Sequence, residues 1–213
     1  MERKNAWLKY DEEGRKTVFE FSERYRRFIS RCKTERECVS QVIEDAKAAG
    51  YEDLNEVVAQ GKTLKPGDKV YCAIMGKSIA LFHLGERPLE EGMNIVGAHI
   101  DSPRLDLKQN PLYEDGNLAM FETHYYGGVK KYQWVALPLA LHGVVAKTDG
   151  TTVSVVLGED PGDPVIGISD LLPHLGRTQM AKNAEKVVEG EDLNILVGSI
   201  PLEDEEKEPV KKR

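Results

Sequence analysis

The sharpest chemical signal in the sequence is a histidine and an aspartate two residues apart, His99-Ile-Asp101. They end an apolar run that starts at Asn94, and Ser102-Pro103 follows, which predicts a buried strand with a sharp turn at its end. Residues two apart in a strand point to the same side, so both side chains can face one site. A carboxylate beside an imidazole fixes its tautomer and makes the other ring nitrogen a better metal donor. The pattern fits a metal ligand with its orienting carboxylate, although a structural strand-end pair is the commoner explanation of the tripeptide alone.

Four other histidines compete for a functional role. His83 lies between apolar residues of an expected strand, and His142 lies inside an apolar run, so both are expected to be structural. His124 precedes Tyr-Tyr-Gly-Gly, where glycines allow a loop to approach a ligand closely, but a turn with aromatic packing is the simpler explanation. His174 follows a proline among turn residues, and its sequence context leaves a surface histidine and a ligand equally open.

The motifs of several other catalytic classes are missing. There is no Gly-x-Ser-x-Gly elbow, and Ser102 is followed by proline instead of a helix, which argues against a nucleophile–His–Asp hydrolase. Neither phosphate-cradling glycine motif occurs. Cys32 and Cys38 form a Cys-x5-Cys pair without zinc-knuckle spacing, and Cys72 stands apart from them. The odd number of cysteines indicates reduced thiols, as in a cytosol, acting as small hydrophobes.

Composition excludes further classes of protein. The chain has 213 residues with 29 Lys and Arg against 36 Asp and Glu, a formal charge of −7, which argues against binding the phosphates of nucleic acids. Apolar runs such as 134–141 are too short to cross a bilayer. The first residues lack the apolar stretch of a secretory signal. We therefore expect a cytoplasmic protein that binds neither nucleic acid nor membrane.

The predicted elements indicate a mixed α/β fold, with helices first and a β-rich second part. Apolar spacing predicts a helix over 17–30, and the capping box Thr34-Glu-Arg-Glu37 opens a second helix that ends at Gly50. Gly76-Lys77 joins two strands of a hairpin, at 70–75 and 78–84. Later β-type runs cover 118–124, 133–147, 151–157 and 193–200. The expected boundary lies near residue 103, giving parts 1–103 and 104–213.

Several separated segments resemble the M18 aminopeptidases, the aspartyl aminopeptidase family. The run from Asn94 to Asp106 is similar to the family's His-Thr-Asp-Ser-Pro segment, with Ile100 where many members carry threonine. The similarity continues, in family order, through 110–112, 123–128, 168–175 and 194–201.

The resemblance implies a zinc exopeptidase that uses two metal ions to hydrolyse the N-terminal bond of peptides. It implies that His99 binds a metal, that Asp101 is the catalytic carboxylate orienting it, and that His174 is a metal ligand or substrate contact near a neighbouring subunit's active site. It also implies that residues 1–103 are part of the peptidase domain. The β-rich remainder would be an inserted dimerisation domain within a dodecamer.

The resemblance also implies that the site is incomplete. The family's remaining ligands and its general-base glutamate lie beyond the segment matched by this chain, and two residues cannot supply a two-metal site. We therefore expect these 213 residues to be inactive alone. A non-catalytic assembly module is the alternative, and a mononuclear His/Asp hydrolase would need more ligands than the sequence offers.

Overall fold

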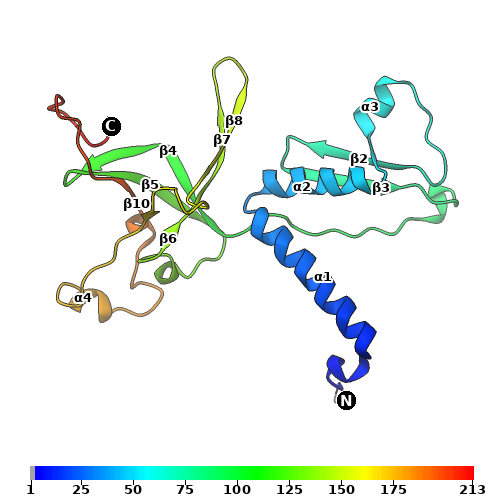
Figure 1. Cartoon of the computed structure of the whole chain (residues 1–213), viewed down its shortest axis with the longest axis horizontal. Coiled ribbons are helices and arrows are strands. Elements are labelled where there is room, and N and C mark those ends of the chain that lie inside the picture. The colour runs from blue at the N-terminus through cyan, green and yellow to red at the C-terminus, as the bar shows by residue number, and fades with distance from the viewer. Residues whose placement is uncertain (1–2) are drawn as a thin grey trace. The chain divides into compact units, whose positions relative to one another are not determined.

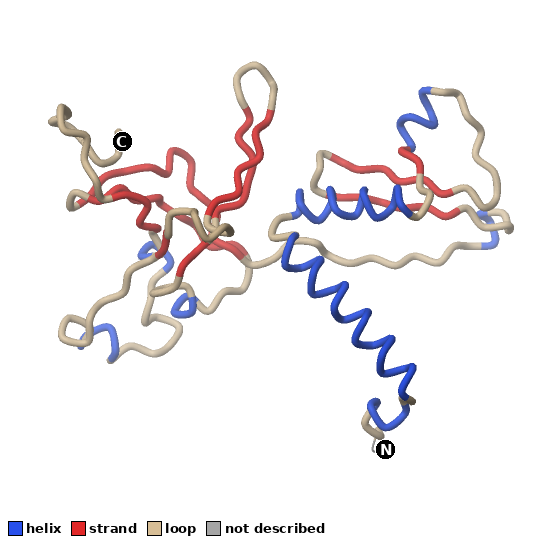
Figure 2. Tube along the Cα trace, in the orientation of Figure 1, coloured by secondary structure: helices blue, strands red, loops and turns tan. Residues whose placement is uncertain are grey.

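The computed structural model describes residues 3–213, and it is a mixed α/β chain with several separate sheets (Figures 1 and 2). This confirms the predicted fold class. Internal contacts divide the chain into two compact units, one ending at Ser102 and the other running from Pro103 to Arg213.

Two helices dominate the beginning of the first unit, after a short 3-10 turn, η1 (Ala6–Lys9). Helix α1 (Glu12–Arg31) starts earlier than its apolar spacing predicts, because the side chain of Asp11 accepts a hydrogen bond from the Gly14 N–H and caps the first turn. No residue of α1 is buried, and Phe21 and Tyr25 are 64% and 60% exposed. Much of the apolar stripe of α1 is therefore exposed among residues 3–213.

Helix α2 (Glu35–Ala48) begins at the predicted capping box. The Glu37 N–H donates to Thr34 Oγ1 at 3.3 Å, and Glu37 Oε2 accepts from the Thr34 N–H at 2.9 Å. These reciprocal bonds satisfy two backbone donors that the first turn of a helix leaves unpaired. The helix buries Cys38, Val39 and Ala46.

A small three-stranded sheet follows the two helices in the first unit. Its strand order is β1 (Glu52–Asp53), β2 (Lys69–Ile74) and β3 (Ser78–His83), and the predicted β2–β3 hairpin is confirmed. Helix α3 (Leu54–Ala59) follows β1 and contributes the buried Val57. The core gathers Val39, Val57, Val70 and Tyr71, each 2% exposed.

The predicted buried strand at 94–101 is wrong. After a 3-10 turn, η2 (Leu89–Glu91), the chain from Gly92 to Pro103 has no regular structure, and Ile95 and Val96 are 81% and 97% exposed. A central strand needs neighbours to accept its backbone hydrogen bonds and layers to cover both faces. The described residues supply neither at this place, so an apolar, strand-like sequence runs through solvent.

The second unit is built on a five-stranded sheet. Its order is β4 (Arg104–Asp115), β5 (Leu118–Tyr126), β10 (Ile195–Gly198), β9 (Ile166–Gly167) and β6 (Pro138–Leu139). A separate two-stranded hairpin joins β7 (Leu141–Ala146) to β8 (Thr152–Leu157). The single run expected over 133–147 is thus divided between η3 (Lys131–Gln133), β6 and β7.

The core of the second unit lies where β9 and β10 meet the loop between them. That loop carries helix α4 (Arg177–Met180) and the turn η4 (Gly190–Asp192). Leu193 is fully buried, and four other apolar side chains join it: Ile166, Ile168, Val188 and Ile195. No described helix, in either unit, is long and apolar enough to cross a bilayer.

Candidate functional site

The His99 and Asp101 side chains meet, although the strand expected to align them is absent. His99 Nδ1 lies 3.1 Å from Asp101 Oδ1 and 3.0 Å from the Asp101 backbone oxygen. The imidazole is 84% exposed and the carboxylate 38% exposed. The contact is therefore made locally, within three consecutive residues, and does not depend on a sheet.

Both groups near His99 Nδ1 are oxygens, and on this ground we assign the proton of the neutral ring to Nδ1. A carboxylate and a carbonyl can only accept, so Nδ1 carries the proton and Nε2 keeps its lone pair in the neutral ring. A carboxylate at this position fixes the orientation of the ring. The pair thus has the form of a metal-binding imidazole with its orienting carboxylate.

The donors around this pair do not complete a metal site. Across residues 3–213, no group of three or more His, Cys, Asp or Glu side chains is placed to hold a metal ion. Zinc usually takes at least three protein ligands, and a two-metal centre needs more. Among residues 3–213, His99 and Asp101 therefore have no third side chain of these types placed to share a metal ion with them.

His174 belongs to the second unit, where it lies in an exposed turn formed by residues 173–175. The backbone oxygen of Leu172 closes this turn by accepting from the N–H groups of Leu175 and Gly176, both at 2.9 Å. Three leucines around the histidine, Leu171, Leu172 and Leu175, are 54%, 67% and 70% exposed. The loop presents an imidazole among apolar side chains to the outside of its unit.

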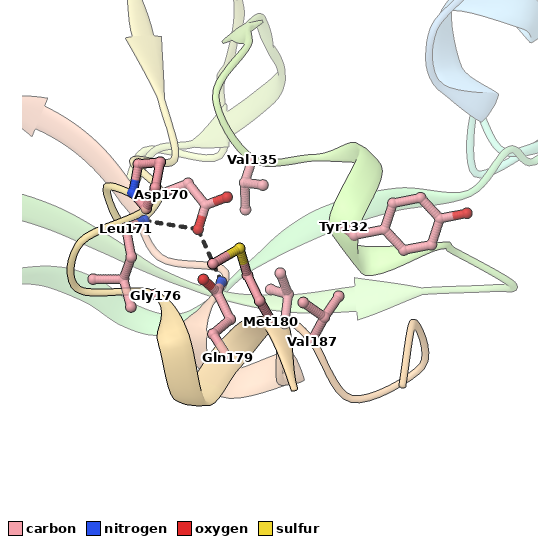
Figure 3. A pocket seen from close by; sticks show the side chains of 10 residues that line it. Tyr132, Val135, Asp170, Leu171, Gly176, Gln179, Met180 and Val187 are labelled. Atoms are coloured by element: carbon pink, nitrogen blue, oxygen red, sulfur yellow. Dashed lines mark hydrogen bonds between the residues drawn. The ribbon is translucent and has the colours of Figure 1, made fainter. Parts of the chain in front are cut away.

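A pocket of about 180 Å³ lies beside the base of this loop (Figure 3). Its lining is mostly apolar, with Val135, Met180 and Val187 among its residues. The Asp170 carboxylate is its charged group, and one of its oxygens accepts from the Leu171 N–H at 2.8 Å and from Gln179 Nε2 at 2.9 Å. These bonds tie the start of the loop to α4, so Asp170 serves to fix the loop.

The remaining histidines take structural or surface positions. His142 has a side chain that is only 11% exposed, and its Nε2 lies 3.0 Å from Glu159 Oε1. His124 is exposed on β5 and stacks on Tyr125, with 5.5 Å between ring centroids. His83 is exposed at the end of β3.

Cys32 and Cys38 lie near each other in the structure, although their spacing in the sequence did not suggest a site. Both thiols are buried where α1 ends and α2 begins, and each donates to a backbone oxygen, Cys32 to Glu37 and Cys38 to Ile100. The signal was present in the positions of the two residues, since they flank the Thr34–Glu37 capping box, which folds the chain back between them.

Comparison with known proteins gives the same family throughout. The family described as aminopeptidase I zinc metalloprotease (M18) matches residues 28–213. A probable M18 family aminopeptidase 1 from Clostridium acetobutylicum is 61% identical over 211 residues, which are 99% of this chain and 45% of that protein.

Solved structures agree in fold as well as in sequence. The crystal structure of an M18 aminopeptidase from Thermotoga maritima matches with a TM-score of 0.89 and 43% identity, over 100% of this chain and 45% of that one. Aminopeptidase I from Clostridium acetobutylicum matches with a TM-score of 0.85 and 58% identity, over 99% of this chain and 46% of that one. This chain thus spans less than half the length of the relatives it matches, and it belongs to the M18 family of aminopeptidase I zinc metalloproteases.

Proposed function

We propose that this chain is the N-terminal portion of a zinc aminopeptidase that removes N-terminal residues from peptides, and that His99 is one of its metal ligands. The observation that carries the proposal is the state of the His99 ring. Its Nδ1 lies against Asp101, and the high exposure of the ring leaves Nε2 accessible to a metal ion that residues of another segment would also bind. Family membership supplies the reaction class.

The roles of the chain's own residues follow from this geometry. Zinc bound at such a site would polarise the scissile carbonyl and lower the pKa of bound water. Asp101 keeps the proton on Nδ1 of His99, which holds the lone pair of Nε2 ready to coordinate. Asp101 therefore orients the ligand and contributes to catalysis through it.

The exposed segment before His99 supports the view that the site is shared with residues outside this chain. Ile95 and Val96 form a strand-like apolar sequence with no partner among residues 3–213. We propose that this segment becomes a paired strand when the rest of the peptidase domain is present, and that the remaining ligands come with it. The 213 residues alone are then catalytically inactive.

The second unit has its own proposed roles. Residues 103–213 would mediate dimerisation, and dodecamer formation in the family's manner, with His174 reaching a metal or a substrate in a neighbouring subunit. The exposed leucines around His174 give that loop the apolar surface that an interface uses. A cytoplasmic location and the absence of nucleic-acid or membrane partners complete the proposal.

Metal content tests the ligand assignment. After zinc loading and desalting, we expect the isolated chain to retain close to none, because one imidazole with a carboxylate binds zinc weakly. In the complete gene product, His99→Ala is expected to lose zinc and peptidase activity, whereas His83→Ala, an exposed histidine at the end of β3, keeps both. Equal behaviour of the two variants would refute the assignment.

The isolated chain also distinguishes the alternatives. Retention of close to two zinc ions, lost in His99→Ala, would mean that this chain completes the site by itself, and peptidase activity should then be present. A gene that stops after Arg213, together with no zinc and no activity, would favour the non-catalytic assembly module.

A further inference from the structure

The two buried thiols of the first unit form a site that the proposed peptidase chemistry does not use. Cys32 is the C-cap residue of α1, and Cys38 lies in the first turns of α2. They are 9% and 6% exposed, and neither is in a disulfide. We propose that Cys32 and Cys38 are a modification site, a dithiol that a low-molecular-weight disulfide such as oxidised glutathione converts to an internal disulfide.

The geometry of the turn between the helices brings the thiols together. Cys32 Sγ donates to the backbone oxygen of Glu37 at 3.6 Å, and Glu37 is joined directly to Cys38. Glu37 Oε2 accepts from the N–H groups of Lys33 and Thr34 at 2.8 Å and 2.9 Å. The segment between the cysteines is thus folded back and fixed before any bond forms. A disulfide needs Cβ atoms about 3.5–4.5 Å apart, and a segment folded back in this way favours such an approach.

The reaction is an ordinary thiol–disulfide exchange. The Cys38 thiolate attacks one sulfur of the small disulfide, which releases one thiolate and leaves a mixed disulfide on Cys38. The Cys32 thiolate then attacks Cys38 Sγ, closes the Cys32–Cys38 bond and releases the second thiolate. Two protein thiols are oxidised, one small disulfide is reduced to two thiols, and the two protons pass to the released thiolates.

Burial sets the speed of this exchange and its route of access. Burial raises the pKa of the Cys32 thiol to about 11, with the neighbouring Cys38 adding to the shift, and burial also raises the pKa of Cys38. Few thiolates exist at neutral pH, so the exchange is slow. Opening the junction between α1 and α2, so that the small disulfide reaches the thiols, costs little free energy. The reason is that α1 contains no buried residue, so separating its end from α2 exposes little apolar surface.

The disulfide would change a hydrogen bond next to the proposed metal ligand His99. Cys38 Sγ donates to the backbone oxygen of Ile100 at 3.6 Å, and Ile100 is the residue between His99 and Asp101. A disulfide sulfur has no hydrogen to donate, so oxidation removes this bond from the segment. Oxidation therefore loosens the attachment of the His99–Asp101 segment to α2.

Peptide mapping after oxidation tests the site on the native chain. Incubation with oxidised glutathione at mildly alkaline pH is expected to lower the count of free thiols from three to one. Trypsin cleaves after Lys33 and Arg36, so the peptides carrying Cys32 and Cys38 should be found joined, and reduction should separate them. Cys72→Ser is the matched control, because Cys72 lies on β2, and this variant should form the same link.

Two further measurements keep the proposal falsifiable. Cys32→Ser should stop at a mixed disulfide with glutathione on Cys38. In wild type, oxidation should shift the NMR signal of the Ile100 carbonyl carbon. Three free thiols in the native chain, under conditions that oxidise the urea-denatured chain, would overturn the proposal. A disulfide that involves Cys72 would overturn the Cys32–Cys38 pairing. An unchanged Ile100 signal would overturn the coupling of the disulfide to the His99–Asp101 segment.

Discussion

Leu193→Ala is expected to remove a large part of the stability of the second unit. Leu193 is fully buried within the apolar cluster of the β9–β10 region, so truncation loses its transfer free energy and leaves a cavity. The site cannot collapse easily, because the Leu193 backbone oxygen accepts a hydrogen bond from the buried Thr123 hydroxyl. The free energy of unfolding should therefore fall by about 3–4 kcal/mol, the middle to upper part of the range for buried leucines. A domain of this size has roughly 5–15 kcal/mol in total.

Urea unfolding followed by tryptophan fluorescence measures this loss. Trp134 packs against the cluster, and the other tryptophan, Trp7, lies in the first unit. In a Trp7→Phe background, Trp134 is the remaining tryptophan, so the fluorescence change reports unfolding of the second unit. Leu172→Ala is the matched control, because Leu172 is 67% exposed and its truncation should cost less than about 1 kcal/mol. If both variants lost the same small amount, the placement of Leu193 in the core would be wrong.

Three further predictions concern single groups. The pKa of Glu23 is lowered from 4.5 to about 2, above all by its hydrogen bonds to Arg26, so its support of α1 is complete above pH 4.5 and disappears as the pH falls towards 2. An NMR titration should show that midpoint, and a midpoint near 4.5 would contradict it. Gly158→Ala should destabilise the second unit by about 1–3 kcal/mol, since its φ is +93° and a Cβ would lie 2.8 Å from a β6 carbonyl oxygen. Gly162→Ala, with no atom within 4 Å of its Cβ, is the control in the same unfolding assay. Alkylation of Cys32 should accelerate about tenfold per pH unit through pH 8 and 9, and a plateau there would refute the raised pKa.

Short-range features were predictable because neighbouring residues create them. The capping box needs only Thr34 and Glu37, whose side chains satisfy backbone groups within one helical turn. The β2–β3 hairpin needs a turn between two alternating runs, and it forms where expected. The His99–Asp101 contact is equally local, so it survives although the strand predicted around it is absent.

Other features depended on residues distant in sequence. The exposure of Ile95 and Val96 could not be predicted, since a strand-like sequence becomes a strand only when other segments pair with it. The apolar stripe of α1 was visible in the sequence, but only the structure shows that the described residues leave every α1 side chain at least partly exposed. Whether His99 has enough companion ligands is likewise a property of the tertiary structure.

The sequence by itself therefore determined the family, the first two helices, the hairpin and the identity of the candidate ligands, because each rests on local spacing or on motifs in a fixed order. The tertiary structure decided that Cys32 and Cys38 meet and that Cys38 donates to Ile100. It also decided that Asp170 fastens the His174 loop to α4. These contacts join separate elements, and their free energies arise only when the chain has packed those elements together.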